Sequence, residues 1–193
     1  PVTLTNHGTP SGTTFEKDGK IGGARSFNGT SDYIAISDND ILDPGDDAIT
    51  YSAWFNTSAS SYDTEYGGIV AKRTGANPGL RLQIGDGSTN NKLYGEFYDG
   101  SSGNNVASTI EPNDGNWHHG AVVLEKIAGG NWRIELFLDG ITQGSSINTS
   151  GNTINSSEPL RIGRADALSQ RYFDGLIDDV RISNRALTAE EIY

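Results

Sequence analysis

Short runs of alternating apolar and polar residues, separated by turn residues, are the feature that most constrains the fold of this chain. In residues 49–57, Tyr51, Ala53 and Phe55 fall on one face of an extended segment, and Trp54 falls on the other. The same period of two recurs along the chain, and turn signals such as Asn-Gly and Asp-Gly separate the runs at intervals of roughly 8–12 residues. The pattern predicts about a dozen short strands with hardly any helix, which is typical of an antiparallel β-sandwich.

The length of the chain suits one large sandwich. Its 193 residues contain no stretch that resembles an interdomain linker, so we expect a single domain spanning residues 1–193. The sequence begins with Pro rather than Met, which indicates that the domain was excised from a larger multidomain protein. No apolar run approaches the roughly 18 residues of a membrane span, so we expect no insertion into a membrane.

The composition narrows the classes of function. Cys is absent, which excludes disulfides, thiol catalysis and Cys-based zinc sites, and fits an exported bacterial protein. The net charge of −11 argues against nucleic acid as a partner, because phosphate binding draws on clustered Lys and Arg. The acidity fits an extracellular module that binds divalent cations; alternatively, it only keeps the domain soluble.

An acidic residue interrupts the apolar face of the last predicted strand. Leu176, Val180 and Ile182 are in phase, and Asp178 stands among them. A carboxylate that points toward a core is costly unless a cation or several hydrogen-bond donors meet it. We therefore expect Asp178 to have a specific partner.

A short helical turn is predicted to close the chain. Thr188 and Glu191 have the spacing of a capping box, and Leu187 and Ile192 have that of a hydrophobic staple.

Six segments together resemble a known family, although each is weak alone. They are Gly-Gly-Ala-Arg-Ser-Phe-Asn-Gly-Thr-Ser-Asp-Tyr-Ile at 22–34, Thr-Tyr-Ser-Ala-Trp-Phe at 50–55, Asn-Trp-His-His-Gly-Ala-Val-Val at 116–123, Leu-Phe-Leu-Asp-Gly at 136–140, Arg-Ile-Gly-Arg at 161–164 and Phe-Asp-Gly-Leu-Ile-Asp-Asp-Val-Arg-Ile at 173–182. In this order they are similar to the laminin-G-like jelly-roll domains of the concanavalin A-like lectin/glucanase superfamily. The resemblance implies two curved antiparallel sheets in an extracellular, often multidomain protein. It also implies a binding module more often than an enzyme.

The resemblance further implies a structural calcium ion. Relatives commonly hold Ca²⁺ through an Asp of the final strand and groups near the first strands. Asp178 matches the final-strand position, and Asp32 is the nearest counterpart at the other end. Because Ca²⁺ takes about six to eight oxygen ligands, backbone carbonyls around Asn28 and Gly29 and water would complete the site. The alternative is that Asp178 accepts backbone N–H bonds or pairs with an Arg.

The middle strands offer a candidate glycan platform. If their apolar halves face the core, their other halves expose aromatic and hydrogen-bonding side chains on one concave face. These are Trp54, Arg81, Gln83, Tyr94, Glu96 and Tyr98. Aromatic rings stack on the apolar faces of sugars and planar polar groups meet the hydroxyls, so this mixture favours a saccharide ligand.

Two alternatives to this platform stay open. Trp54, like Trp117, occupies a framework position of the family and would then simply pack within the fold. A rival site lies at the rim, where Tyr62, Tyr66 and Lys72 belong to or adjoin the loop at residues 58–67.

Catalysis is not expected. Glycosidases of this superfamily carry an acidic pair in a Glu-x-Asp-x-x-Glu pattern, and no such segment occurs here. Glu135 and Asp139 share a strand face but lie about 13 Å apart by strand rise, which is too far for retaining chemistry. His118 and His119 are adjacent in a strand and point to opposite faces, so packing is the better interpretation of both.

We therefore expect a non-catalytic, lectin-like carbohydrate-binding module of a secreted or cell-surface protein, such as a polysaccharide-degrading enzyme or an adhesin. Its partners would be a polysaccharide or cell-surface glycan and other domains of the same parent chain. The alternative is a structural or protein-interaction domain of an extracellular adhesin or matrix-like protein. A glycoside hydrolase or polysaccharide lyase is the least favoured reading.

Overall fold

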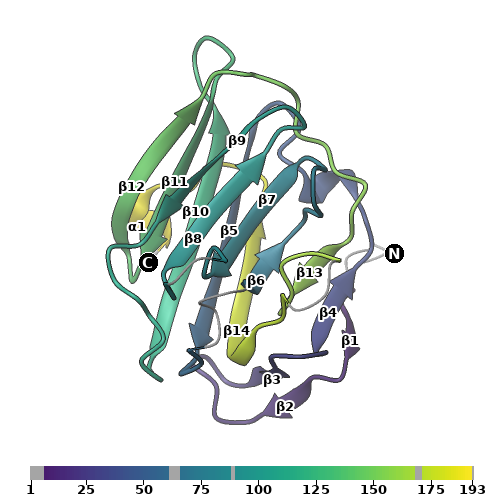
Figure 1. Cartoon of the computed structure of the whole chain (residues 1–193), viewed down its shortest axis with the longest axis vertical. Coiled ribbons are helices and arrows are strands. Elements are labelled where there is room, and N and C mark those ends of the chain that lie inside the picture. Colours follow the sequence, from purple (N-terminus) through teal and green to yellow (C-terminus); the bar gives the residue numbers. More distant parts are fainter. Residues whose placement is uncertain (1–6, 61–65, 88–89, 168–170, 193) are drawn as a thin grey trace.

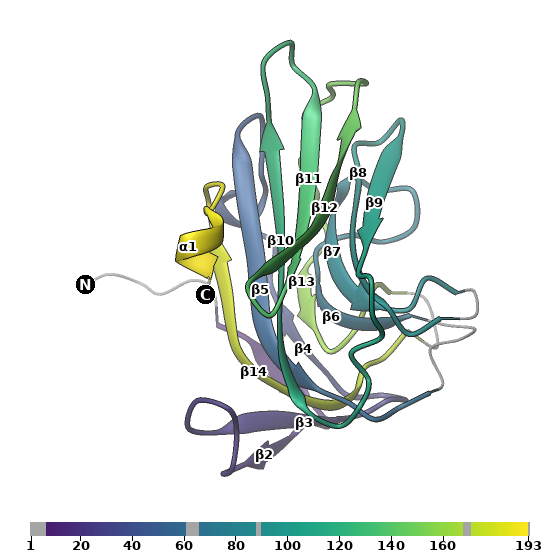
Figure 2. The same cartoon turned by 90° about the vertical axis from the view of Figure 1, so that its left-hand side faces the viewer.

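The chain folds as an all-β sandwich of two antiparallel sheets, which confirms the predicted jelly-roll class (Figure 1). The computed structural model describes residues 7–60, 66–87, 90–167 and 171–192. Within this part of the chain, each sheet contains seven strands. The two sheets lie face to face, and the short helix α1 (Ala189–Ile192) lies against the outside of one of them (Figure 2).

Sheet A is the one that faces the viewer in Figure 1. In spatial order it consists of β1 (Thr9–Ser11), β4 (Tyr33–Ile36), β13 (Leu160–Ile162), β6 (Gly67–Ala71), β7 (Gly79–Ile84), β8 (Leu93–Tyr98) and β9 (Gly103–Ala107).

Sheet B lies behind sheet A and contains the longest strands. Its order is β12 (Ile141–Asn148), β11 (Trp132–Leu138), β10 (Trp117–Lys126), β5 (Ala48–Asn56), β14 (Asp174–Ser183), β3 (Ala24–Asn28) and β2 (Thr14–Glu16). A single 3-10 turn (Asp40–Leu42) lies between β4 and β5. None of the helices in the described residues is long and apolar enough to cross a membrane.

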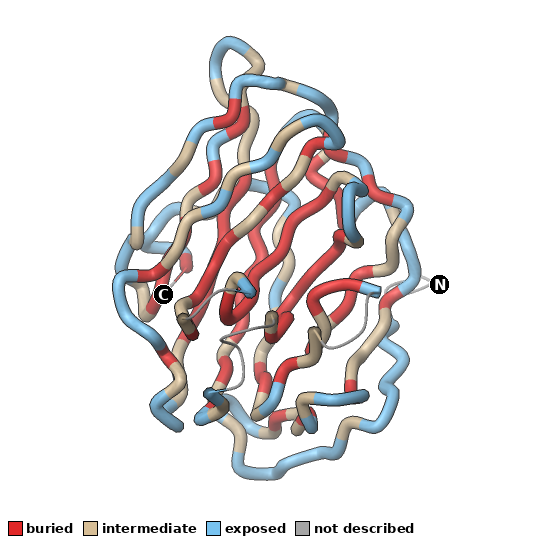
Figure 3. The backbone as a smooth tube through the Cα atoms, viewed as in Figure 1, coloured by how far each residue is buried: buried red, intermediate tan, exposed pale blue. Residues whose placement is uncertain are grey.

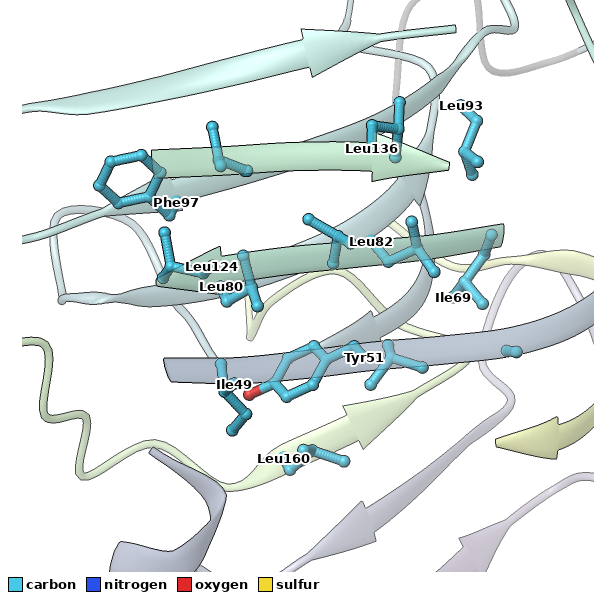
Figure 4. Packing of buried hydrophobic residues seen from close by; sticks show 14 of the residues in the cluster. Ile49, Tyr51, Ile69, Leu80, Leu82, Leu93, Phe97, Leu124, Leu136 and Leu160 are labelled. Atoms are coloured by element: carbon cyan, nitrogen blue, oxygen red, sulfur yellow. The ribbon is translucent and has the colours of Figure 1, made fainter. Parts of the chain in front are cut away.

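The core forms where the apolar halves of the alternating strands meet between the sheets. Sheet A contributes side chains such as Leu80, Leu82 and Phe97, and sheet B contributes Tyr51 and Leu136 (Figure 4). All five are almost completely buried, while the edges and loops are exposed (Figure 3). Trp132 is also fully buried, as its phase predicts. Each strand therefore has one outer face, and the outer faces of the middle strands are where a ligand could bind.

A β-bulge in β14 overturns the predicted phase of the last strand. Asp178 pairs with Trp54 and Arg181 pairs with Ser52, so that two residues, Asp179 and Val180, stand opposite one residue of β5. The extra residue reverses the alternation. Val180 and Ile182 face the core as predicted, but the prediction that Asp178 shares that face is wrong, because it precedes the bulge and points outward with Trp54.

The C-terminal segment packs on the outer face of sheet B and confirms the predicted helical turn. Ile192 belongs to a small buried apolar cluster, and Leu187 packs against this cluster, whose other members are Ala121, Val123 and Phe137. The side chain of Glu191 accepts a hydrogen bond from the Thr188 amide at 3.0 Å, which is one half of the predicted capping box. This packing builds a wall along one side of the sheet B surface.

Candidate functional site

Five of the predicted glycan-binding residues lie together on the outer face of sheet A. Arg81 and Gln83 of β7 stand opposite Glu96 and Tyr94 of β8, respectively, and Tyr98 lies two residues beyond Glu96. They alternate with the core residues of the same strands, but the prediction that this face exposes them is wrong for three of the five, because Arg81, Gln83 and Tyr94 are themselves buried.

These five residues are largely engaged with one another and with neighbouring loops. Glu96 pairs with Arg73 and, at 2.8 Å, with Arg81. The Arg73 guanidinium lies 5.0 Å from the centre of the Tyr98 ring, and the Arg81 guanidinium lies 5.6 Å from that of Tyr66. Burial alone would raise the pKa of Glu96, but the two arginines outweigh it and hold that pKa below its usual value. The cluster is an ion-pair network in which Glu96 remains charged.

Tyr94 and Gln83 are also bonded internally. The Tyr94 hydroxyl hydrogen bonds to Asp86 at 2.9 Å and to Asn90 at 3.0 Å, and Gln83 Nε2 donates to the Gly85 carbonyl at 3.1 Å. Among the described residues, Gln83 Oε1 is a buried polar atom of this face that has no partner. A ligand here would compete with contacts that the protein already makes.

Lys72 is not a rim residue, so that prediction is wrong. Its side chain is 1% exposed, and its ammonium lies 2.7 Å from Asp38 Oδ1 and 2.8 Å from Asp43 Oδ2. It also donates to the Ser156 carbonyl. Lys72 follows β6 at the sheet A edge of the core, where a long stem can stay apolar while the head group meets two carboxylates. Of the other two rim candidates, Tyr62 lies outside the described residues, and the Tyr66 ring contacts the guanidinium groups of Arg81 and Arg171.

Trp54 lies on the opposite side of the molecule from these residues, so the prediction that it shares their face is wrong. It belongs to β5, a central strand of sheet B, and points outward between His119 of β10 and Asp178 of β14. The alternation assigned the correct outer phase, but it could not show which sheet each strand joins.

The indole of Trp54 forms part of a groove on the outer face of sheet B, which we call the Trp54 groove. Its volume is about 640 Å³. It is lined by Ile21, Ser52, Trp54, His119, Asp179, Arg181, Ser183, Arg185, Leu187, Glu191 and Ile192. One wall is the C-terminal segment with α1, and the other is the loop between β2 and β3. A cavity of this size suits a small ligand or one or two rings of a polymer.

Trp54 is half-buried, and its ring has two neighbours. The His119 ring centre lies 5.2 Å away at an interplanar angle of 50°. The ammonium of Lys20 lies 4.2 Å from the indole centre, in a cation–π contact. Lys20 is exposed and makes no ion pair within the described part of the chain, so its side chain is able to move away from the ring.

His119 lines the groove and contains a buried polar atom without a partner. The residue is only 7% exposed, and its Nδ1 atom has no hydrogen-bond partner among the described residues. Burial lowers the pKa of His119, so the ring is neutral at pH 7. A buried ring nitrogen without a partner costs stability.

Asp179 and Arg181 present a charged pair at the mouth of the groove. They are joined by an ion pair of 2.8 Å. The backbone of Asp179 has a φ of 45°, a left-handed conformation that is uncommon outside glycine. The β-bulge imposes it, and bulges of this kind often redirect side chains at binding sites.

Asp178 holds the wall of the groove that carries Lys20. Its Oδ2 atom accepts a hydrogen bond of 2.7 Å from the Ile21 amide, and its Oδ1 atom accepts one of 2.7 Å from the Asp179 amide. A Cβ atom at Gly19 would lie 2.8 Å from Asp178 Oδ2, so the loop approaches the carboxylate closely. The last strand is thereby fastened to the early part of the chain.

The other predicted calcium ligands have partners of their own. Asn28 Oδ1 accepts hydrogen bonds from the amides of Thr30, Ser31 and Asp32. Asp32 is buried at the start of β4, where Oδ1 accepts a bond of 3.2 Å from Ser31 Oγ. Among the described residues, no three His, Asp or Glu side chains lie close enough to share a metal ion. Any calcium ion held by these residues would draw most of its ligands from backbone carbonyls, Gly29 included, and water.

Sequence reasoning missed most of the Trp54 groove. His119 was assigned to packing, and Ser52 and Arg185 were given no role. The sequence does indicate that Ser52 and Trp54 lie on the same, outer face of β5, because both alternate with core residues. Pairing with β10 and β14 was needed to bring His119 and Arg181 beside them.

Comparisons with known proteins agree with this fold. A family model described as the concanavalin A-like lectin/glucanases superfamily matches residues 28–193. No functionally curated protein sequence matches significantly.

Solved structures with the same fold include binding domains of several kinds. The binding domain of Paraclostridial Mosquitocidal Protein 1 has a TM-score of 0.75 at 14% identity, and the match covers 97% of this chain and 46% of that one. Domain 4 of AbnA, an extracellular arabinanase from Geobacillus stearothermophilus solved with arabinotriose, has a TM-score of 0.66 at 22% identity, covering 94% and 80%. Domains LG4-5 of the mouse laminin alpha1 chain have a TM-score of 0.58 at 16% identity, and the match covers 86% of this chain and 41% of that one. The chain thus spans about half the length of the toxin domain.

Proposed function

Because the chain belongs to the concanavalin A-like lectin/glucanase superfamily, through a laminin-G-like family model that matches residues 28–193, we propose that it is a non-catalytic carbohydrate-binding module. The saccharide binds in the Trp54 groove. The observation that carries this proposal is a half-buried indole in a groove of about 640 Å³ that Ser52, His119 and Arg181 also line.

The groove has the chemistry that sugars require. The apolar face of a pyranose or furanose ring stacks on an aromatic side chain, and Trp offers the largest such surface. Ser52, His119 and Arg181 surround Trp54 with a hydroxyl, a ring nitrogen and a guanidinium that can meet sugar hydroxyls. Apolar contact with a few polar groups that fix orientation is the usual composition of a small-ligand site.

Similar structures support the same class of function. Domain 4 of the arabinanase was solved with a bound oligosaccharide, and the toxin domain is a binding domain. We therefore place this module in a secreted or cell-surface protein of bacterial origin, either a polysaccharide-degrading enzyme or an adhesin. A structural calcium ion near Asp178 and Asp32 is part of the proposal.

The absence of catalysis is also proposed. Glu135 accepts a hydrogen bond of 3.0 Å from Thr142, and Asp139 Oδ2 bonds to His118 Nδ1 at 2.8 Å. Both acids are thus engaged in local structure, and neither lines the Trp54 groove.

Binding of a glycan panel to the 193-residue chain tests the proposal, with two aromatic variants that separate the faces. Trp54→Ala should abolish binding, whereas Tyr98→Ala on sheet A should leave it unchanged. Both variants must retain the wild-type circular dichroism spectrum. Loss of binding only in Tyr98→Ala would move the site to sheet A. If no saccharide of a broad panel, arabinotriose included, binds the wild-type chain, the proposal fails and the structural or protein-interaction alternative takes its place.

A further inference from the structure

The charges around the Trp54 groove indicate which class of saccharide it binds, an inference that rests on the proposed function. All three carboxylates at the groove are already engaged. Both oxygens of Asp178 accept hydrogen bonds from backbone amides, those of Ile21 and Asp179. The carboxylate of Asp179 forms an ion pair of 2.8 Å with Arg181. Glu191 pairs with Arg185 at 2.8 Å and accepts the Thr188 amide. The groove therefore offers few free acceptors.

The cations at the groove keep most of their donors. Lys20 makes no ion pair within the described residues, and its ammonium lies over the face of Trp54. Arg181 has a side chain that is 67% exposed and uses one terminal nitrogen for Asp179. A guanidinium has five N–H groups, so Arg181 retains donors for a ligand. Lys20 and Arg181 therefore offer charged donors without a partner, and such donors favour a ligand that carries a negatively charged acceptor.

We propose that the Trp54 groove binds a saccharide that contains a uronic acid. The sugar ring stacks on Trp54, and its carboxylate lies between Lys20 and Arg181. The carboxylate of a uronic acid projects from the edge of the sugar ring, so a ring stacked on the indole directs it toward side chains around Trp54, where Lys20 contacts the indole and Arg181 lines the groove. The planar guanidinium of Arg181 also matches a carboxylate in shape.

Lys20 has to leave the indole face when the sugar stacks there. An exposed cation–π contact of this kind is weak and corresponds to about a two- to fivefold change in affinity. For a uronate, Lys20 regains a partner in the carboxylate. For a neutral sugar it regains none, so Lys20 acts as a selectivity filter that disfavours neutral rings.

The net charge of −11 does not prevent this binding. At physiological ionic strength the screening length is about 8 Å, so acidic residues elsewhere on the chain are largely screened from the groove. At the groove itself, the donors without a partner belong to the cations Lys20 and Arg181.

The test compares an oligogalacturonate with its fully methyl-esterified form, which has the same backbone without the charge. Affinities are measured by calorimetry at physiological salt for the wild-type chain, Lys20→Ala and Trp54→Ala. The wild type should bind the acid at least about tenfold more tightly than the ester, as expected for one charge-assisted contact. Lys20→Ala should strengthen ester binding about two- to fivefold, because the cation–π contact no longer has to be displaced. It should weaken acid binding by a net factor of about two to five, because the same relief offsets part of the roughly tenfold loss of the carboxylate contact. Lys20 is exposed, so this variant is not expected to disturb folding.

Each other result overturns the inference in a recognisable way. If acid and ester bind equally and Trp54→Ala abolishes both, the saccharide site stands and the uronate preference is wrong. If the acid binds but Trp54→Ala has no effect, the binding is non-specific charge attraction and the inference fails. If Lys20→Ala changes both ligands by the same factor, the proposed contact with the carboxylate is absent. If neither ligand nor any member of the glycan panel binds, the proposed function itself fails.

Discussion

Replacement of Lys72 by Met should destabilise the fold strongly, because Lys72 is the buried centre of an ionic cluster. Its ammonium lies 2.8 Å from Asp43 Oδ2, and the side chains of Lys72 and Asp43 are 1% and 2% exposed. Met fills a similar volume but provides no charge. Asp43 then remains buried either as an unpaired anion or as a neutral acid. Removing one partner of a buried ion pair typically costs about 3–5 kcal/mol.

The free energy needed to protonate Asp43 sets an independent upper limit on this loss of stability. An unfolded Asp titrates near 3.8. Protonating Asp43 at pH 7 therefore costs at most about 4 kcal/mol, at about 1.4 kcal/mol per pH unit. Burial already raises the pKa of Asp43 in the native chain, and the contacts with Lys72 oppose that rise. Without Lys72 the pKa of Asp43 rises further, which makes the neutral form the accessible one.

The sign of the pH dependence follows from this rise. Above pH 3.8 the folded variant holds a proton on Asp43 that the unfolded chain releases, so its stability falls as pH increases. The deficit relative to wild type should thus be up to about 3 kcal/mol smaller at pH 5 than at pH 7.

Urea denaturation at the two pH values measures both effects. A matched control is Lys126→Met, whose partner Asp46 is 61% exposed; the loss of stability there should be much smaller, because an exposed ion pair contributes little. A Lys72→Met deficit below about 1 kcal/mol at pH 7, or one independent of pH, would refute the account of a buried cluster.

Three further predictions concern the loops and the proposed ion. Asp178→Ala should cost about 1–3 kcal/mol and speed amide exchange in residues 19–22, because Ile21 and Asp179 lose their acceptor; unchanged exchange would show that the contact does not hold the loop. Burial would lower the pKa of His118, but its bonds to Asp139 and a second carboxylate outweigh that and raise it above 6.5. The stabilisation from charged His118 is complete below pH 6.5 and is lost as pH rises through the raised pKa, so wild type should lose stability relative to His118→Gln between pH 6 and 8, and a constant difference would contradict this. Removal of calcium by EDTA should lower the melting temperature by about 5–10 °C, if the ion is present at about a hundredfold above its dissociation constant; an unchanged melt would eliminate the ion.

The sequence predicts most of the fold because alternation reports directly on burial. Leu80, Leu82 and Trp132 are buried as their phases require, and Thr188 and Glu191 mark the helical turn correctly. The pattern does not report pairing between strands. Trp54 was therefore grouped with Arg81 although the two lie on opposite sheets.

Two other errors have identifiable structural causes. The bulge at Asp179 has no signature in a period of two, and without it Asp178 falls on the wrong face. Lys72 follows an apolar strand and was read as a rim residue, because the sequence does not show that Asp38 and Asp43 fold back beside it. Long-range electrostatic partners are invisible until the topology is known.

The most direct test of the central claim is to map a bound saccharide by NMR. An oligosaccharide that binds the chain is titrated into isotope-labelled protein, and shifts of the amides and of the Trp54 indole are followed. The Trp54 groove predicts the largest shifts at Ser52, Trp54, His119 and Arg181, with little change on sheet A. Shifts concentrated instead at Arg81, Glu96 and Tyr98 would contradict the account and place the ligand on the ion-pair network.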